Sequence, residues 1–140
     1  MADITNKITI HWFQSNLKNL SAEHDTYFYA FSRANKLLYI GKSHFTELKN
    51  EVNQNLKRLN ISNIGLVIWV GYMFDESVYK NKLQELVDDA ESLLIYRNKT
   101  QFNEKKTKSY RGRVPFKVIS VGMPLLKKTI TITTSSPLQR

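Results

Sequence analysis

The order of hydrophobic and polar positions predicts a chain that begins with a strand. Ile4, Ile8 and Ile10 alternate with polar residues, as in a short, half-buried strand. Residues 14–20 favour a helix, and residues 21–25 favour a polar loop. The first part of the chain is therefore interpreted as a strand and a helix that precede the main body of the fold.

Two aromatic-rich segments in the first third of the chain predict an antiparallel hairpin. Residues 26–32 read TYFYAFS and residues 37–41 read LLYIG, a composition that suits pleated, half-buried strands. Residues 33–36 form a turn in which Asn35 can take a positive φ. Because the connection is so short, the two strands should pair with each other.

Two helical stripes, separated by a buried strand, follow the hairpin. The first helix, with Ser43 placed to cap it, has apolar residues every three or four positions: Phe45, Leu48, Val52, Leu56 and Leu59. Residues 65–74 are almost all apolar or aromatic, as in a buried strand. The second helix would be capped by Asp75 or Ser77 and fade near Asn98, and its stripe is Leu83, Leu86, Val87, Ala90, Leu93 and Leu94.

The end of the chain returns to strand patterning, and the element order predicts the fold class. Residues 116–121 and 129–134 alternate like strands, and the tail 135–140 is expected to be disordered. Since local hairpin pairing dominates, we expect an α+β fold. Its core would be a small antiparallel sheet of about three central strands flanked by helices, with extra N- and C-terminal strands.

The length of 140 residues fits one domain. Within it we expect an N-terminal extension (1–25), a core (26–103) and a basic loop with the last strands (104–140). The first residues lack the basic start and apolar run of a signal peptide, and the longest apolar stretch, residues 66–70, is too short to span a bilayer. A cytoplasmic protein without a membrane partner is therefore expected.

The charge balance narrows the class of partner. Lys and Arg outnumber Asp and Glu by 21 to 12, which gives a net charge of +9. This excess favours a polyanion, either nucleic acid or a membrane surface, although a basic protein without a charged ligand is the alternative. The absence of cysteine excludes disulfides, thiolate catalysis and cysteine-bound zinc.

Two features are unusual for residues that only pack. Tyrosines cluster on the two strands of the hairpin, at Tyr27, Tyr29 and Tyr39. Glu91 lies on the apolar side of the second predicted helix, where a carboxylate is costly unless it is paired, hydrogen-bonded or metal-bound. The alternative is that Glu91 occupies the solvent edge of the stripe.

The order of these motifs resembles the GIY-YIG nuclease family. The segment 27–31, followed by the run YIGK at residues 39–42, is similar to the family's paired GIY and YIG strands. The family's helix glutamate, followed by an aromatic-Asn pair, corresponds to Glu91 and then Phe102-Asn103. A single Y-I-G recurs by chance, so the resemblance rests on the combination, which covers residues 26–103.

The resemblance implies a metal-dependent DNA endonuclease that hydrolyses phosphodiester bonds with Mg²⁺ or Mn²⁺. Glu91 would hold the ion, with water and phosphate oxygens completing its shell. Tyr29 would help to activate the attacking water, and Tyr39 would form a hydrogen bond at the same centre. Lys42 would tune a tyrosine or contact phosphate, and Asn103 would brace the site from its loop.

The chain departs from the family pattern at three positions, which leaves alternatives open. Tyr27 replaces the leading Gly of the GIY triplet. Lys49 stands at the place of the family's helix arginine, so it keeps the charge but loses the bidentate grip on phosphate. Asn53 stands where the family has His or Tyr and cannot transfer a proton. A nuclease with a variant site, a catalytically weakened nucleic-acid-binding module and a protein-interaction domain with coincidental motifs are all compatible with this pattern.

A basic segment after the second predicted helix is interpreted as a contact with the DNA backbone. It holds six cationic residues and one acidic residue between positions 99 and 113, together with Tyr110, which could stack on a base. The cationic residues are Lys99, Lys105, Lys106, Lys108, Arg111 and Arg113. The alternative is a solubilising loop.

A homodimer is a possible assembly, because two copies of so small an enzyme could cut both strands of a DNA duplex.

Overall fold

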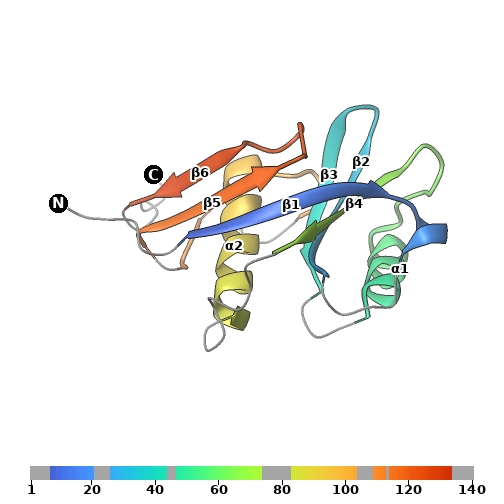
Figure 1. Ribbon diagram of the computed structural model, residues 1–140. Coiled ribbons are helices and arrows are strands. Elements are labelled where there is room, and N and C mark those ends of the chain that lie inside the picture. Colours follow the sequence, from blue (N-terminus) through green and yellow to red (C-terminus); the bar gives the residue numbers. More distant parts are fainter. Residues whose placement is uncertain are drawn as a thin grey trace.

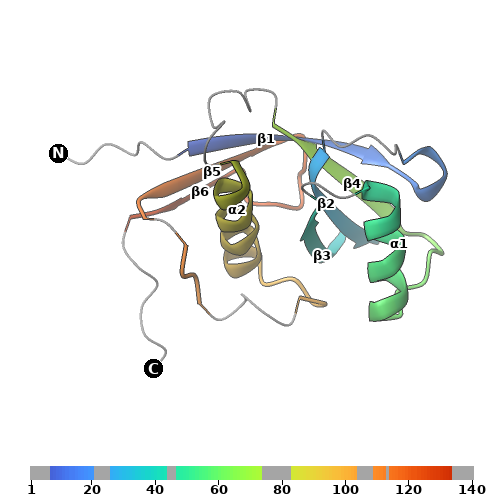
Figure 2. The same cartoon turned by 90° about the horizontal axis from the view of Figure 1, so that it is seen from below.

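The computed structural model describes residues 7–20, 26–43, 47–73, 83–103, 109–112 and 114–133. The expectations for Ile4, for the capping residues Asp75 and Ser77 and for the tail 135–140 lie outside these ranges. The described residues form one curled sheet, with one helix on its concave side and another against the opposite face (Figures 1 and 2).

All described strands belong to a single sheet of six strands in the order β3-β2-β4-β1-β5-β6. The elements follow one another along the chain as β1 (Lys7–Ser15), the 3₁₀ turn η1 (Leu17–Asn19), β2 (Thr26–Arg33), β3 (Lys36–Lys42), α1 (Leu48–Leu59), β4 (Val67–Tyr72), α2 (Leu83–Asn98), β5 (Phe116–Val121) and β6 (Thr129–Ile132).

The expected fold class is wrong, because the sheet is neither small nor wholly antiparallel. β1 lies between β4 and β5, antiparallel to β4 but parallel to β5, with Ile8 opposite Val118. The terminal strands are thus integral to a strand-rich, mixed sheet rather than additions to a three-stranded one. The parallel pair joins segments from opposite ends of the chain, which no local pattern can indicate.

The expected helix over residues 14–20 is also wrong. β1 continues to Ser15, and only the short 3₁₀ turn η1 follows it. Trp12 is buried, whereas its neighbour Phe13 is 49% exposed on the other side of the sheet. This alternation belongs to a strand, in which successive side chains point to opposite faces.

The hairpin prediction is confirmed. β2 and β3 pair antiparallel, with Tyr29 opposite Gly41, and the turn residues Ala34 and Asn35 have positive φ values of 52° and 63°. The two predicted helices are confirmed over Leu48–Leu59 and Leu83–Asn98, while Phe45, the first residue of the predicted stripe, lies outside the described residues. Ser43 is not a helix cap; it is buried after β3, and Glu47 is the residue that precedes α1.

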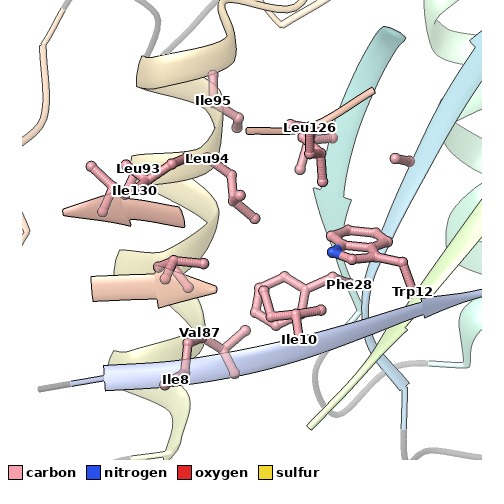
Figure 3. Packing of buried hydrophobic residues seen from close by; sticks show 14 of the residues in the cluster. Ile8, Ile10, Trp12, Phe28, Val87, Leu93, Leu94, Ile95, Leu126 and Ile130 are labelled. Carbon is pink, nitrogen blue, oxygen red and sulfur yellow. The ribbon is translucent and has the colours of Figure 1, made fainter. Parts of the chain in front are cut away.

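The two faces of the sheet bury two different apolar clusters. On the concave side, α2 sends Val87, Leu93 and Leu94 into the space that side chains of β1, β5 and β6 fill from the sheet (Figure 3). On the opposite face, α1 buries Leu48, Val52 and Leu56 against β2 and β4. Neither of these helices combines the length and the apolar character needed to cross a membrane, as judged over the described ranges.

Candidate functional site

Tyr29 and Tyr39 lie side by side on the face of the hairpin that α1 covers. Their ring centroids are 6.1 Å apart, and both rings pack on Phe31 with centroids at 5.5 Å. Tyr29 is 1% exposed, whereas Tyr39 is only half-buried. Tyr39 is therefore the member of the pair that a ligand can reach.

Gly41 makes room for the ring of Tyr29. The two residues face each other across β2 and β3, and a Cβ atom on residue 41 would lie 2.4 Å from Cζ and 2.6 Å from the hydroxyl oxygen of Tyr29. These separations are far below van der Waals contact, so only glycine allows the ring to cross the strand here. The glycine of the YIG run is thus required by the tyrosine of the neighbouring strand.

Two polar residues of α1 bind the Tyr29 hydroxyl, and a third, Arg58, binds one of them; none of the three was predicted from the sequence. The Tyr29 hydroxyl donates to the Glu51 carboxylate at 3.3 Å and accepts a hydrogen bond from the amide of Asn55. That amide also donates to Glu51 at 2.7 Å. Arg58 in turn donates to the Asn55 side-chain oxygen through two nitrogens, at 3.0 and 2.9 Å.

The positions of the apolar residues along α1 could have predicted this network. Val52 and Leu56 point into the sheet, so the preceding residues, Glu51 and Asn55, lie one helical turn apart beside the buried face. The resemblance to the family pattern predicted Lys49 and Asn53 at this centre instead. Both of these are exposed, and Asn53 lines a groove on the outer side of α1.

Glu91 reaches the same centre from α2. Its side chain is 7% exposed, and its negative charge is felt at Tyr39. The edge-of-stripe alternative therefore does not describe it. The structure thus places Tyr29 beside Tyr39 and puts Tyr39 within the electrostatic range of Glu91, and it adds Glu51, Asn55 and Arg58 to this centre.

The electrostatics of this centre keep both tyrosines protonated. Burial is the largest cause that raises the pKa of Tyr29, with Tyr39 and Glu51 adding to it. Burial also raises the pKa of Tyr39, followed by the charge of Glu91, whereas Arg58 acts in the opposite direction. The hydroxyls are therefore hydrogen-bond donors at neutral pH, and neither is poised to remove a proton from water.

The donor set at the centre fits a hard divalent cation. Carboxylates are the oxygen ligands that Mg²⁺ and Mn²⁺ prefer, and the negative charge of Glu91 and Glu51 at Tyr39 would favour a bound cation. Among the described residues, no three His, Asp or Glu side chains gather closely enough to hold an ion unaided. An ion held by Glu91 would therefore take most of its ligands from water or substrate.

The buried hydroxyl of Tyr29 predicts a loss of stability at alkaline pH. The folded protein keeps the Tyr29 proton above the pH of about 10 at which the unfolded chain releases it. Its contribution is thus present below that pH and is lost as the pH rises further. The free energy of unfolding should fall by about 1.4 kcal/mol per pH unit for this group.

Urea unfolding between pH 8 and 11 measures this slope of stability against pH. The slope should be shallower for the Tyr29→Phe variant than for the wild type and for the control variant Tyr96→Phe. An unchanged slope in Tyr29→Phe would contradict the assignment of this pH dependence to Tyr29.

Lys42 forms an ion pair with an acidic residue of α2 and not with the tyrosines. Its ammonium group pairs with the Asp88 carboxylate of α2. Both partners are more than a third exposed, so the pair links β3 to α2 at the surface and contributes little to stability. A cation that does act on Tyr39 is Arg58, in the tuning role that the sequence had suggested for Lys42.

Asn103 binds the main chain of the edge strand that carries Tyr39. Its side-chain oxygen accepts from the Ile40 amide and its nitrogen donates to the Ile40 carbonyl, both at 3.0 Å. The amide of Phe102 adds a bond to the Leu38 carbonyl at 2.8 Å. The aromatic-Asn pair thus acts as a short strand partner that fixes the backbone on both sides of Tyr39.

Loss of this pairing should be measurable. Asn103→Ala leaves both polar groups of Ile40 without their partner, and we expect the free energy of unfolding to fall by about 1–3 kcal/mol. Asn103→Asp should also destabilise, because a carboxylate cannot donate to the Ile40 carbonyl. Urea unfolding at pH 7 is the measurement, with the exposed neighbour Gln101→Ala as the control. Equal stability of the Asn103 and Gln101 variants would refute the bracing role.

Comparisons with known proteins identify no relative of this chain. No family model, curated protein or solved structure matches the chain. The resemblance to GIY-YIG nucleases therefore rests on the order of the motifs, and the chemistry of the site rests on the side chains that the fold brings together.

Only part of the basic segment can be placed. Lys99 is exposed, has a positive φ of 50° and lies with its ammonium group 4.9 Å from the centroid of the Tyr96 ring. Arg111 is also exposed, next to Asp89 and Ser92 of α2 in a shallow pocket. Tyr110 is fully buried and cannot stack on a base. Lys105, Lys106, Lys108 and Arg113 lie outside the described residues.

Proposed function

We propose that the chain is a metal-dependent DNA endonuclease of the GIY-YIG type, which hydrolyses phosphodiester bonds at the centre formed by Tyr39, Glu91 and the Tyr29–Glu51–Asn55 network. The observation that carries the proposal is the buried carboxylate of Glu91, whose charge acts on the half-buried Tyr39. A carboxylate buried next to a tyrosine pair is an arrangement that a reaction centre gives a physical reason to retain. The order of the family motifs supports the same function.

The side chains of the centre have distinct tasks under this proposal. Glu91 would hold Mg²⁺ or Mn²⁺, which when bound polarises the scissile phosphate and stabilises the leaving oxygen. Tyr39 donates a hydrogen bond to the attacking water or to a phosphate oxygen. Tyr29 has its hydroxyl bound by Glu51 and Asn55, so it positions the Tyr39 ring rather than the water.

Arg58 supplies the positive charge that the family pattern places at Lys49. It is exposed, and Asn55 holds its guanidinium group through Nε and one terminal nitrogen. The other terminal nitrogen can donate to a phosphate oxygen, which suits the planar, always charged guanidinium. Charge develops on these oxygens during the reaction, so a fixed cation accelerates it.

The proposal is tested by metal-dependent cleavage of plasmid, branched and single-stranded DNA. We expect Glu91→Gln to abolish cleavage while its urea unfolding still shows a folded protein. Arg58→Ala should lower the rate by about 10²–10³-fold, whereas the matched control Lys49→Ala should remain close to wild type. A wild-type protein that is inert on every substrate with both metals would refute the proposal.

One observation favours a second candidate, a nucleic-acid-binding module that does not cleave. Tyr29 is 1% exposed and its hydroxyl is already engaged, so it cannot approach a water as the family pattern expects. The same assays separate the two functions. A module would bind DNA with equal affinity in the presence of Mg²⁺ and of a chelator, and it would leave the DNA intact.

A further inference from the structure

The outer side of α1 carries an open groove that the proposed reaction does not use. Its volume is about 660 Å³, within the range of small-ligand sites. Apolar side chains from η1, α1 and the turn after α1 line it, together with six polar residues. The apolar residues are Leu17, Leu56 and Ile61, and the polar residues are Asn50, Asn53, Gln54, Lys57, Asn60 and Asn63.

The groove has an unusual polar composition. Among the described residues that line it, five of the six polar ones carry neutral amides, the sixth is a lysine, and none carries a carboxylate. On α1, the groove residues Asn50, Asn53, Gln54 and Lys57 are all exposed and share one helix face. The acidic Glu51 points the other way, toward Tyr29. The helix thus keeps the carboxylate of Glu51 away from the neutral to basic face that lines the groove.

This chemistry matches a nucleotide. An amide side chain presents a donor and an acceptor side by side, as the edge of a nucleobase does, and Asn and Gln form paired hydrogen bonds with adenine in this way. The apolar residues offer contact area to a planar ring, and Lys57 can reach the attached phosphate. The net charge of +9 favours a polyanion over a neutral or basic peptide.

The shape of the groove selects an unpaired base. In a duplex the bases are stacked, and only their edges are exposed at the bottom of the grooves. A concave site has to receive the whole ring, which is available in single strands, loops and extruded nucleotides. We propose that the α1 groove binds an unpaired base of single-stranded or branched DNA. This inference rests on the proposed function and names its substrate class.

A single rigid helix links the groove to the reaction centre. Asn53 and Gln54 face the groove, whereas the next residue, Asn55, binds the Tyr29 hydroxyl on the inner side. A base held in the groove therefore has a fixed position relative to Tyr39 and Glu91. The groove would decide which DNA structures present a phosphate to the centre.

Measuring DNA binding in the presence of a metal chelator tests the groove without DNA cleavage. Fluorescence anisotropy with a labelled 12-nucleotide single strand and the duplex of the same sequence would be measured for wild type and for the double variant Asn53→Ala/Gln54→Ala. Both positions are exposed on a helix, where alanine is well tolerated. We expect the affinity of the double variant for the single strand to fall by about tenfold, with loss of the preference over duplex.

Two control variants make the expectation specific. Gln14→Ala removes an exposed amide that does not line the groove, and Lys36→Ala removes an exposed lysine at the hairpin turn. Gln14→Ala should bind as wild type does. Lys57→Ala should weaken binding to all DNA sequences. It should also reduce the slope of log affinity against log salt concentration by about one, as expected for one lost phosphate contact. Both effects should be larger than those of Lys36→Ala.

The outcomes distinguish this inference from the proposed function. Unchanged single-strand affinity in the double variant overturns the groove assignment, even if the wild type cuts DNA in the presence of Mg²⁺. A tenfold loss in the double variant supports the groove, even if no metal produces cleavage. Tighter binding of RNA than of DNA of the same sequence overturns the choice of DNA, and a wild type that binds no single strand overturns the inference as a whole.

Discussion

Replacing Gly41 by alanine is expected to disrupt the tyrosine centre and to lower the free energy of unfolding by roughly 1–3 kcal/mol. The new methyl group would have to lie 2.4 Å from Cζ of Tyr29, a ring that β2, α1 and Tyr39 enclose. Since the ring has no free space, either it rotates away from Glu51 and Asn55 or the two strands separate. Urea unfolding measures the loss of stability, and a plasmid-nicking assay measures the loss of activity.

A double-mutant cycle identifies the cause. If the clash with the Tyr29 ring is responsible, Gly41→Ala should cost much less in a Tyr29→Leu background, which lacks the ring. The interaction energy between the two substitutions should then exceed about 0.5 kcal/mol. Additive effects would show that Gly41 is needed for another reason, because its own φ is not in the left-handed region.

The hairpin and the helices could be predicted because their signals are local. Aromatic alternation around a short turn places Tyr29 and Tyr39 on adjacent strands, and an apolar stripe defines each helix. The spacing of the second stripe put Glu91 on the apolar side of its helix, with the solvent edge as the alternative, and the structure buries its side chain. Each of these inferences depends on residues within a few turns or one hairpin of one another.

The composition of the centre could not be obtained in the same way. The family pattern fixes a distance along the chain, whereas the residues that face Tyr29 depend on where α1 begins. Because α1 begins at Leu48, its inner face presents Glu51 and Asn55, and Lys49 and Asn53 lie on the exposed side. A shift of two residues in the start of a helix turns a side chain to the opposite face.

The place of β1 in the sheet was the least predictable feature, and it has the largest consequence for stability. Ile10 is fully buried on the concave side, between the neighbouring strands and α2 (Figure 3). We expect Ile10→Ala to lower the free energy of unfolding by about 2–5 kcal/mol. The control Thr9→Ala, on the other face of the same strand, should cost less than about 1 kcal/mol. Urea unfolding of both variants is the measurement.

A chain that begins at Thr26 extends this prediction from one side chain to the whole strand. Without β1, both β4 and β5 lose a hydrogen-bonded neighbour, and the concave cluster loses Ile8, Ile10 and Trp12. Since a domain of this kind is stable by only about 5–15 kcal/mol, the shortened chain should show no cooperative unfolding transition. If β1 were a dispensable extension to a core of residues 26–103, the shortened chain would unfold cooperatively at nearly the urea concentration of the full chain. That result would contradict the central position of β1, and it would return the terminal strands to the peripheral role that the sequence pattern had suggested.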